Sequence, residues 1–286
     1  MRTKHILLIV GLTLVSVLAG VAAVAAAVVY SGVYNVAATR QHVQPVFTLL
    51  ATALRHSVRL RARDIAPPPL DDPATVLRGA ACFQAKCVQC HGAPGVSQGD
   101  IGKSMQPLPG PLVDARGRWQ PRELYWVTRH GIKMSGMPAW EYRMTEAELW
   151  SVVAFMQRLP DLNAQQYASF MNEASAAPVC GRDTQALEPG RVMPIDAERG
   201  RRALFQYACN ACHTIPGVTS ASPQVGPPLE GFANRSMIAG VLTNSPDNLV
   251  RWLRETQQVK PMTAMPQLGL TERDAWDIGA YLGTLR

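Results

Sequence analysis

The sequence is short of charge, of aromatic residues and of any pattern that predicts a β-sheet. Charged residues make up 17% and aromatic residues 7% of its 286 residues. No strand patterns alternate with helical ones, and no long segment alternates apolar with polar residues. These absences argue against an α/β fold and an extended sheet. The length is enough for about two domains.

No Asp, Glu, Lys or Arg lies between Lys4 and Arg40. As a helix, the apolar run over residues 6–29 would be about 36 Å long, enough to cross a bilayer with some tilt. The basic residues before it are typical of an N-terminus that stays in the cytoplasm. A cleaved signal peptide is the alternative, because the alanine-rich stretch 22–27 offers small-residue cleavage sites. The length of the run favours an uncleaved transmembrane anchor over residues 1–35.

The net charge of +7 does not predict a nucleic-acid partner, because it is confined to one segment. Residues 1–70 carry seven basic residues and one acidic residue. Residues 72–161 and 190–286 each carry ten basic and eight acidic residues. Nucleic-acid-binding domains concentrate basic residues on the binding domain itself. We therefore expect no nucleic acid, and a basic arm that faces solvent or lipid.

The basic arm, residues 36–71, is predicted to be an amphipathic helix over residues 45–63 that ends before a stiff spacer of three prolines. Its apolar face carries Phe47, Leu50, Leu54 and Val58. Arginines recur every four residues on another face, at Arg55, Arg59 and Arg63. Such a helix lies at a membrane surface or against a partner. The histidines of the arm, His42 and His56, lie outside the repeats described next and are predicted to be solvated.

One five-residue motif occurs twice, as Cys87-Val88-Gln89-Cys90-His91 and as Cys209-Asn210-Ala211-Cys212-His213. Cys-x-x-Cys-His is the attachment signature of a c-type haem. Its two cysteines lie about one helical turn apart and can hold one edge of a macrocycle, while the histidine ligates the iron. We predict two covalently bound haem c groups, one on Cys87, Cys90 and His91 and the other on Cys209, Cys212 and His213.

Each motif lies in a repeat with the same order of features. A glycine in the opening helix, Gly79 or Gly200, would let another helix approach closely. Phe83 and Phe205 stand four residues before their motifs, which makes Leu204 the counterpart of Cys82. A middle helix is expected over residues 122–129 and 246–255. The closing helices begin at capping threonines, Thr145 and Thr271. We assign residues 72–160 to the first domain and 191–286 to the second, with a linker over 161–190 that carries a short helix near 163–174.

A methionine followed by proline comes after each middle helix: Met137 and Met265. A thioether suits the second axial position of an electron carrier, because it favours the reduced iron and raises the potential. The proline fixes the loop and removes a competing N–H. We predict Met137 and Met265 as iron ligands together with His91 and His213. Rival candidates are Met134 and Met262, each three residues earlier, and His130 in the first repeat.

A ligating histidine usually donates a hydrogen bond from its other ring nitrogen to a carbonyl. The sequence Gly226-Pro227-Pro228-Leu229 makes the Pro227 carbonyl the candidate in the second repeat. In the first repeat, Pro107, Pro109 and Pro111 offer no clear choice.

Two cysteines, Cys82 and Cys180, lie outside the motifs. Haem attachment of this kind belongs to an oxidising compartment, where remaining thiols can pair. The spacing does not establish a disulfide between them, and Cys82 can equally be a small core residue.

In combination, these motifs resemble class I c-type cytochrome domains over residues 72–160 and 191–286. Residues 131–140 look like membrane-anchored bacterial cytochromes c, and residues 244–266 are similar to the cytochrome c domain fused to some cytochrome c oxidase subunits II. The resemblance implies covalent haem, a small all-α fold for each domain and periplasmic electron transfer. The first domain departs from the family, because it has no clean Gly-Pro-x-Leu and has Cys82 where an aliphatic residue is usual.

We therefore expect a single-pass protein of the bacterial inner membrane with its haem domains in the periplasm. It would pass single electrons from a respiratory dehydrogenase or quinol-oxidising complex to a terminal oxidase or soluble cytochrome. No paired acid and base indicates a substrate pocket, so we expect an electron-transfer protein and not an enzyme. The alternatives are a dihaem oxidoreductase of the peroxidase or thiosulfate-oxidising type, which needs an open axial site, and the cytochrome subunit of a dehydrogenase complex.

Overall fold

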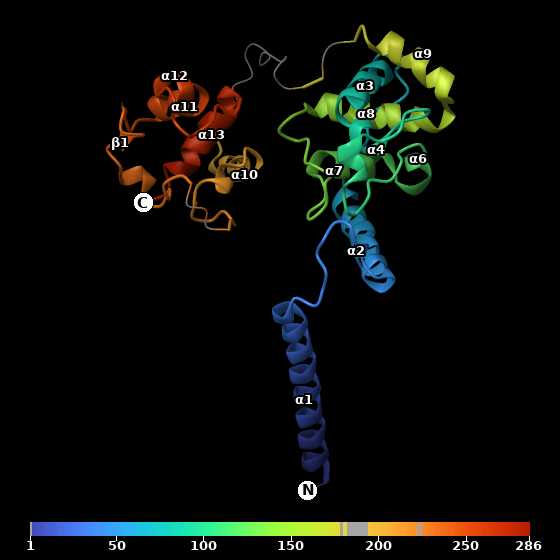
Figure 1. Ribbon diagram of the computed structural model, residues 1–286, viewed down its shortest axis with the longest axis vertical. Helices are drawn as coiled ribbons and strands as arrows, with labels where there is room; N and C mark the ends of the chain where they lie inside the picture. Colours follow the sequence, from blue (N-terminus) through green and yellow to red (C-terminus); the bar gives the residue numbers. More distant parts are fainter. Residues whose placement is uncertain (1, 178–179, 182–193, 222, 224) are drawn as a thin grey trace.

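The computed structural model describes residues 2–177, 180–181, 194–221, 223 and 225–286. Its regular structure is helical apart from one antiparallel pair of two-residue strands among these residues. This confirms the all-α prediction. Figure 1 shows a long helix α1, a shorter helix α2, and two helical domains beside each other.

The elements of each domain follow the order expected from the repeats. The first domain contains α3 (Pro73–Lys86), α4 (Val88–His91), α5 (Asp100–Lys103), α6 (Ala115–Arg118), α7 (Pro121–His130), α8 (Glu146–Arg158), η1 (Leu159–Asp161) and α9 (Ala164–Ala174). The second contains α10 (Ala197–Gln206), η3 (Cys209–Ala211), η4 (Phe232–Asn234), β1 (Met237–Ile238), β2 (Leu242–Thr243), α11 (Pro246–Arg254), α12 (Thr256–Val259) and α13 (Glu272–Leu282).

Helix α1 (Arg2–Ser31) is long and apolar enough to cross a bilayer, with a mean hydropathy of 2.7 over its most apolar window. None of its residues is buried by the rest of the described chain. A helix that is apolar all round needs an apolar environment, which lipid supplies. One such helix near the N-terminus fits both a membrane anchor and a signal sequence.

Helix α2 (Gln44–Ala62) forms the predicted arm, and its C-terminal half packs on α7 of the first domain. Val58 and Ala62 are fully buried there. The Arg59 Nε atom lies 3.7 Å from a carboxylate oxygen of Glu123 at the start of α7. Phe47, near the other end of α2, is half exposed. The first domain therefore covers only the C-terminal half of the apolar face.

In both domains the opening helix packs against the closing helix through its glycine. A β-carbon built on Gly79 of α3 would lie 1.8 Å from the Ser151 carbonyl oxygen of α8. A β-carbon on Gly200 of α10 would lie 1.9 Å from the Asp277 carbonyl oxygen of α13. The predicted close approach is thus confirmed in both repeats, and the glycines mark equivalent points of the two opening helices.

The equivalence of Gly79 and Gly200 corrects one expectation from the sequence. Phe83 is fully buried, whereas Phe205 is 59% exposed and the preceding Leu204 is buried instead. Leu204 is therefore the counterpart of Phe83, and the residue before Leu204 is the counterpart of Cys82. The second repeat has one more residue between its glycine and its motif, and Ala208 takes up the difference in a left-handed conformation with φ of 56°. Counting back from the motif cannot detect such an insertion.

The closing helices begin at the predicted threonines. The Thr145 hydroxyl accepts the Glu148 N–H at 3.2 Å, and the Glu148 carboxylate accepts the Thr145 N–H at 2.7 Å. The Thr271 hydroxyl accepts the Asp274 N–H at 3.1 Å. These caps satisfy N–H groups that the first turn of a helix leaves free, so local sequence sets where each helix begins.

Helix α9, which sequence analysis places in the linker, packs against α3 of the first domain. The Tyr167 hydroxyl of α9 donates a hydrogen bond of 2.7 Å to the side chain of Gln84. Tyr167 is buried, together with residues of α3 and α8, in the core of the first domain. Residues 178–179 and 182–190 of the expected linker lie outside the described residues, as do residues 191–193 at the start of the expected second domain.

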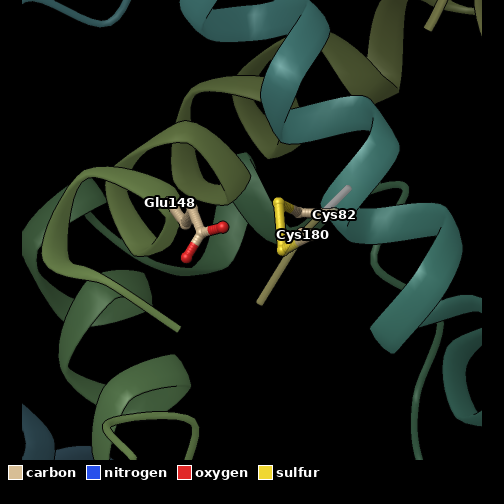
Figure 2. Close-up of side chains that lie close together, drawn as sticks. All are labelled: Cys82, Glu148 and Cys180. Atoms are coloured by element: carbon tan, nitrogen blue, oxygen red, sulfur yellow. A yellow bond between two sulfur atoms is a disulfide. The ribbon is translucent and has the colours of Figure 1, made fainter. Parts of the chain in front are cut away.

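A disulfide joins Cys82 of α3 to Cys180, with their Cα atoms 5.0 Å apart. Figure 2 shows it beside Glu148 of α8, whose carboxylate also accepts the Gly181 N–H at 2.9 Å. The sulfurs and this carboxylate are grouped closely enough for a metal ion. A disulfide, however, has no thiolate to offer a metal, and the Glu148 oxygens already accept backbone N–H groups. The Cys82–Cys180 bond, which the sequence spacing did not establish, is therefore a structural disulfide that fastens residue 180 to the first domain.

Candidate haem-binding sites

The two Cys-x-x-Cys-His motifs share the same backbone hydrogen bonds, although the first is α-helical and the second is a 3₁₀ turn. In each, the histidine N–H donates to the first cysteine's carbonyl at 2.9 Å. The second cysteine's N–H donates to the same carbonyl, at 3.1 Å in the first domain and 3.2 Å in the second. One short turn therefore carries both thiols and the imidazole, as predicted for Cys87, Cys90 and His91 and for Cys209, Cys212 and His213.

Among the described residues, the four motif cysteines form no disulfide. Burial raises the pKa of the Cys87 thiol to about 12 and that of the Cys209 thiol to about 11. Reactive cysteines of redox-active dithiol motifs show the opposite, a lowered pKa that favours the thiolate. The first cysteine of each motif, Cys87 or Cys209, therefore does not have the electrostatic surroundings of a reactive thiolate.

Each motif histidine is fixed by a carbonyl in a loop that follows it. The Nδ1–H of His91 donates to the Gly110 carbonyl, and the Nδ1–H of His213 donates to the Pro227 carbonyl, both at 2.7 Å. Because a carbonyl can only accept, the proton is on Nδ1 and Nε2 keeps its lone pair. That is the tautomer an iron ligand needs, so both sites fit a haem.

The Pro227 carbonyl is the one predicted from the sequence, whereas in the first domain the acceptor is Gly110 and none of the three candidate prolines. The two acceptors are nevertheless equivalent, because each directly precedes a Pro-Leu pair: Pro111-Leu112 or Pro228-Leu229. The Pro-Leu pair was therefore the sequence feature from which the Gly110 carbonyl could have been predicted as the acceptor. The residue before it can vary, since only its backbone carbonyl is used.

The loops around the histidines leave little free space. A β-carbon on Gly226 would lie 2.5 Å from Cε1 of the His213 ring, so only glycine lets this loop pass so closely.

Burial lowers the pKa of His91, an effect opposed by its hydrogen bond to Gly110. A lowered pKa favours the neutral imidazole, which is the form that can ligate a metal.

The Met-Pro loops are also alike. Met134 and Met262, the rival ligands, both have a left-handed backbone, with φ of 55° and 62°. Their side chains are 100% and 96% exposed. Met137 and Met265 are half-buried, and Met265 packs against the core of the second domain.

Side chains and backbone hold these loops in place. Gln257 of α12 donates to the Met265 carbonyl at 2.8 Å and to the Thr263 carbonyl at 3.0 Å. In the first domain, a β-carbon on Gly131 would lie 2.7 Å from the Met137 carbonyl oxygen. Both Met-Pro segments are therefore set by contacts with their own domain.

Two further residues bear on the first site. Met105, which the sequence analysis did not single out, lies against the loop, because a β-carbon on Gly136 would be 2.3 Å from its sulfur. It has no following proline, so no sequence signal marked it. His130, the third candidate ligand, has Nδ1 3.6 Å from a Glu141 carboxylate oxygen and its ring 5.0 Å from that of Trp126.

Comparison with known proteins gives two family matches. Residues 74–156 match the family described as cytochrome c oxidase, cbb3-type, subunit III, and residues 197–286 match the family described as cytochrome c. The chain is 32% identical over 107 residues to cytochrome c oxidase subunit 2 of Alkalihalophilus pseudofirmus. It is 33% identical over 88 residues to the same subunit of Bacillus sp. strain PS3. The matches cover 37% and 29% of this chain but only 30% and 25% of those proteins.

Proposed function

We propose that this chain, which carries two cytochrome c-type domains for two covalent haem c groups behind one apolar helix, transfers single electrons in a periplasmic respiratory chain. The observation that carries the proposal is the carbonyl-bound Nδ1–H of each motif histidine. It fixes in both domains the tautomer that haem iron requires. When bound, each haem supplies the one-electron chemistry of its iron.

The chain's own residues would hold each haem from three sides. Cys87 and Cys90, and their counterparts Cys209 and Cys212, would form the covalent bonds, and His91 and His213 would ligate the irons. We assign the other axial positions to Met137 and Met265. This is supported by the solvent exposure of the side chains of their rivals, Met134 and Met262, whose backbone is in the left-handed region. Thioether ligation raises the potential, which suits a carrier late in a respiratory chain.

Several observations support the location and the acceptor. The Cys82–Cys180 disulfide fits an oxidising compartment, so it supports haem domains on the periplasmic side of the membrane. Helix α1 supports a single-pass anchor in the bacterial inner membrane. The similarity of part of the chain to part of cytochrome c oxidase subunit 2 supports a terminal oxidase as acceptor. The donor would be a respiratory dehydrogenase or a quinol-oxidising complex.

The decisive experiment uses the full chain purified from solubilised membranes. We expect two covalent haems per chain, methionine-to-iron absorption from both ferric haems, and no carbon monoxide binding by either native ferrous haem. The reduced protein should then reduce a terminal oxidase. Carbon monoxide binding by one native haem would show an open axial site and favour the dihaem oxidoreductase instead. Fewer than two covalent haems would contradict the proposal outright.

A further inference from the structure

Four residues form a contact between the two cytochrome domains. Arg143, between α7 and α8 of the first domain, donates from Nη2 to the Gln206 carbonyl of the second at 3.0 Å. Its guanidinium lies 4.6 Å from the centre of the Tyr207 ring. The ring of Tyr142 meets the same Tyr207 ring edge-on, with centroids 6.3 Å apart. We call these four residues the interdomain patch.

The two tyrosines of the interdomain patch are buried. Tyr142 belongs to the first domain, yet it is only 6% exposed and forms part of the core cluster of the second domain. Tyr207 is also buried, and its hydroxyl donates a hydrogen bond of 2.7 Å to Asp274 of α13. The contact between the domains therefore consists of packed aromatic rings and hydrogen bonds.

The patch lies next to both candidate haem sites along the chain. Tyr207 precedes Cys209 by two residues, and Tyr142 follows Met137 by five. The contact thus joins the haem-attachment segment of one domain to the segment that follows the Met-Pro loop of the other. Figure 1 shows α10 on the side of the second domain that faces the first.

The patch is made from parts that the two repeats do not share. Thr145 follows Met137 by eight residues, whereas Thr271 follows Met265 by six, so the segment with Tyr142 and Arg143 is longer than its counterpart. With the helix glycines aligned, Tyr207 stands where the first domain has a lysine. Residues needed by every such domain would recur in both repeats. These differences therefore point to a role in joining the domains.

We propose that the interdomain patch is the electron-transfer contact between the two cytochrome domains, an inference that rests on the proposed function. One electron would leave one domain, which is oxidised, and enter the other, which is reduced, with no bond or proton exchanged. Arg143 and Tyr142 are positioning residues in this step: they hold the domains together and are themselves neither oxidised nor reduced.

The test uses the full-length, haem-loaded protein with the variants Arg143→Ala and Tyr142→Ala. Arg251→Ala is the matched control, because Arg251 is an exposed arginine of α11 whose nearest carboxylate is Glu255 on its own helix. Small-angle scattering reports whether the domains stay together. Photoreduction by one electron reports how fast the electron redistributes between the haems, and separate redox titrations report each potential.

We expect a larger radius of gyration and slower redistribution in both patch variants. In Arg143→Ala the redistribution should slow by about tenfold, the factor that corresponds to a lost hydrogen bond of a charged group. The spectrum and potential of each haem should stay unchanged, and Arg251→Ala should behave like the wild type. Arg143→Lys keeps the charge but loses the planar guanidinium, so it should restore the rate only in part.

Two results would overturn the inference. One is unchanged redistribution in the patch variants, whether or not the scattering changes. The other is an altered haem spectrum in Arg143→Ala, which would make this segment part of a haem site and not a domain contact. A wild-type protein that lacks two reducible covalent haems would instead contradict the proposed function.

Discussion

The Cα of Gly79 lies so close to the backbone of Ser151 that a β-carbon at residue 79 would come within 1.8 Å of the Ser151 carbonyl oxygen. Helices α3 and α8 are therefore in backbone contact at this point, and no side chain fits between them. Gly200 and Asp277 repeat the relationship in the second domain. Because α3 and α10 lead directly into the Cys-x-x-Cys-His motifs, these contacts also place the candidate haem sites against their closing helices.

Replacing either glycine by alanine should separate the helices and destabilise the domain that contains it. We expect Gly79→Ala and Gly200→Ala each to cost about 1–3 kcal/mol or more of unfolding free energy, as for overpacked cores. Gly279→Ala is the matched control, because its β-carbon would be 3.5 Å from Leu249 Cδ2, an ordinary contact. In helix α13 that change should stabilise by about 0.5–1 kcal/mol through helix propensity. Denaturant unfolding measures all three, and equal effects would contradict the packing argument.

Removing the disulfide should destabilise the first domain alone. The bond closes a loop between residues 98 positions apart that contains almost the whole domain. Chain-entropy reasoning gives a stabilisation of about 4–5 kcal/mol for such a loop, and measured losses for native disulfides are typically about 2–5 kcal/mol. We expect Cys82→Ala with Cys180→Ala to lower the unfolding midpoint of the first domain and to leave that of the second unchanged. Thiol reduction of the wild type should reproduce the effect. If free thiols were detected at both positions in the oxidised native protein, the bond would not exist there.

Methionine replacements should each affect one haem. Met137→Ala and Met265→Ala should abolish the methionine-to-iron absorption band of the haem in their own domain. The potential of that haem should fall by on the order of 0.1 V, within the ~0.8 V range that axial ligands set. Met134→Ala and Met262→Ala are matched controls that should leave spectra and potentials unchanged. In the first domain, Met105→Ala distinguishes a loop-packing residue, which leaves the band in place, from an iron ligand, which removes it.

Acid should weaken the cap at the start of α3. The Asp72 carboxylate accepts the hydroxyl of Thr75 at 2.6 Å and its N–H at 2.8 Å, and these hydrogen bonds, the hydroxyl first, lower the pKa of Asp72. A lowered pKa means that this stabilisation is fully present above the unfolded-state pKa, about 3.9, and is lost as pH falls through the folded-state pKa. Asp72→Ala should therefore be less stable than the wild type at neutral pH, with the difference vanishing in acid. A difference that persisted at pH values below both pKa values would show that the carboxylate charge is not responsible.

Much of the candidate site could be predicted from local sequence. Cys-x-x-Cys-His, Met-Pro and the capping threonines act within one turn or one loop, so spacing along the chain defines them. The first-domain carbonyl was missed because only the backbone of Gly110 is used, so its position is marked by the Pro111-Leu112 pair that follows and not by the residue type at 110. The position of Phe205 was misjudged because a single left-handed residue, Ala208, shifts the helix by one residue relative to the motif.

The sequence by itself determined which residues are candidates for haem binding and where the closing helices begin, because the attachment motif and helix capping depend on fixed short spacings. Only the tertiary structure decided that Cys82 meets Cys180, that α9 packs on the first domain, and that Tyr142 lies in the core of the second. These contacts join residues far apart in the chain. Their partners are selected by the packing of whole helices, which no short spacing encodes.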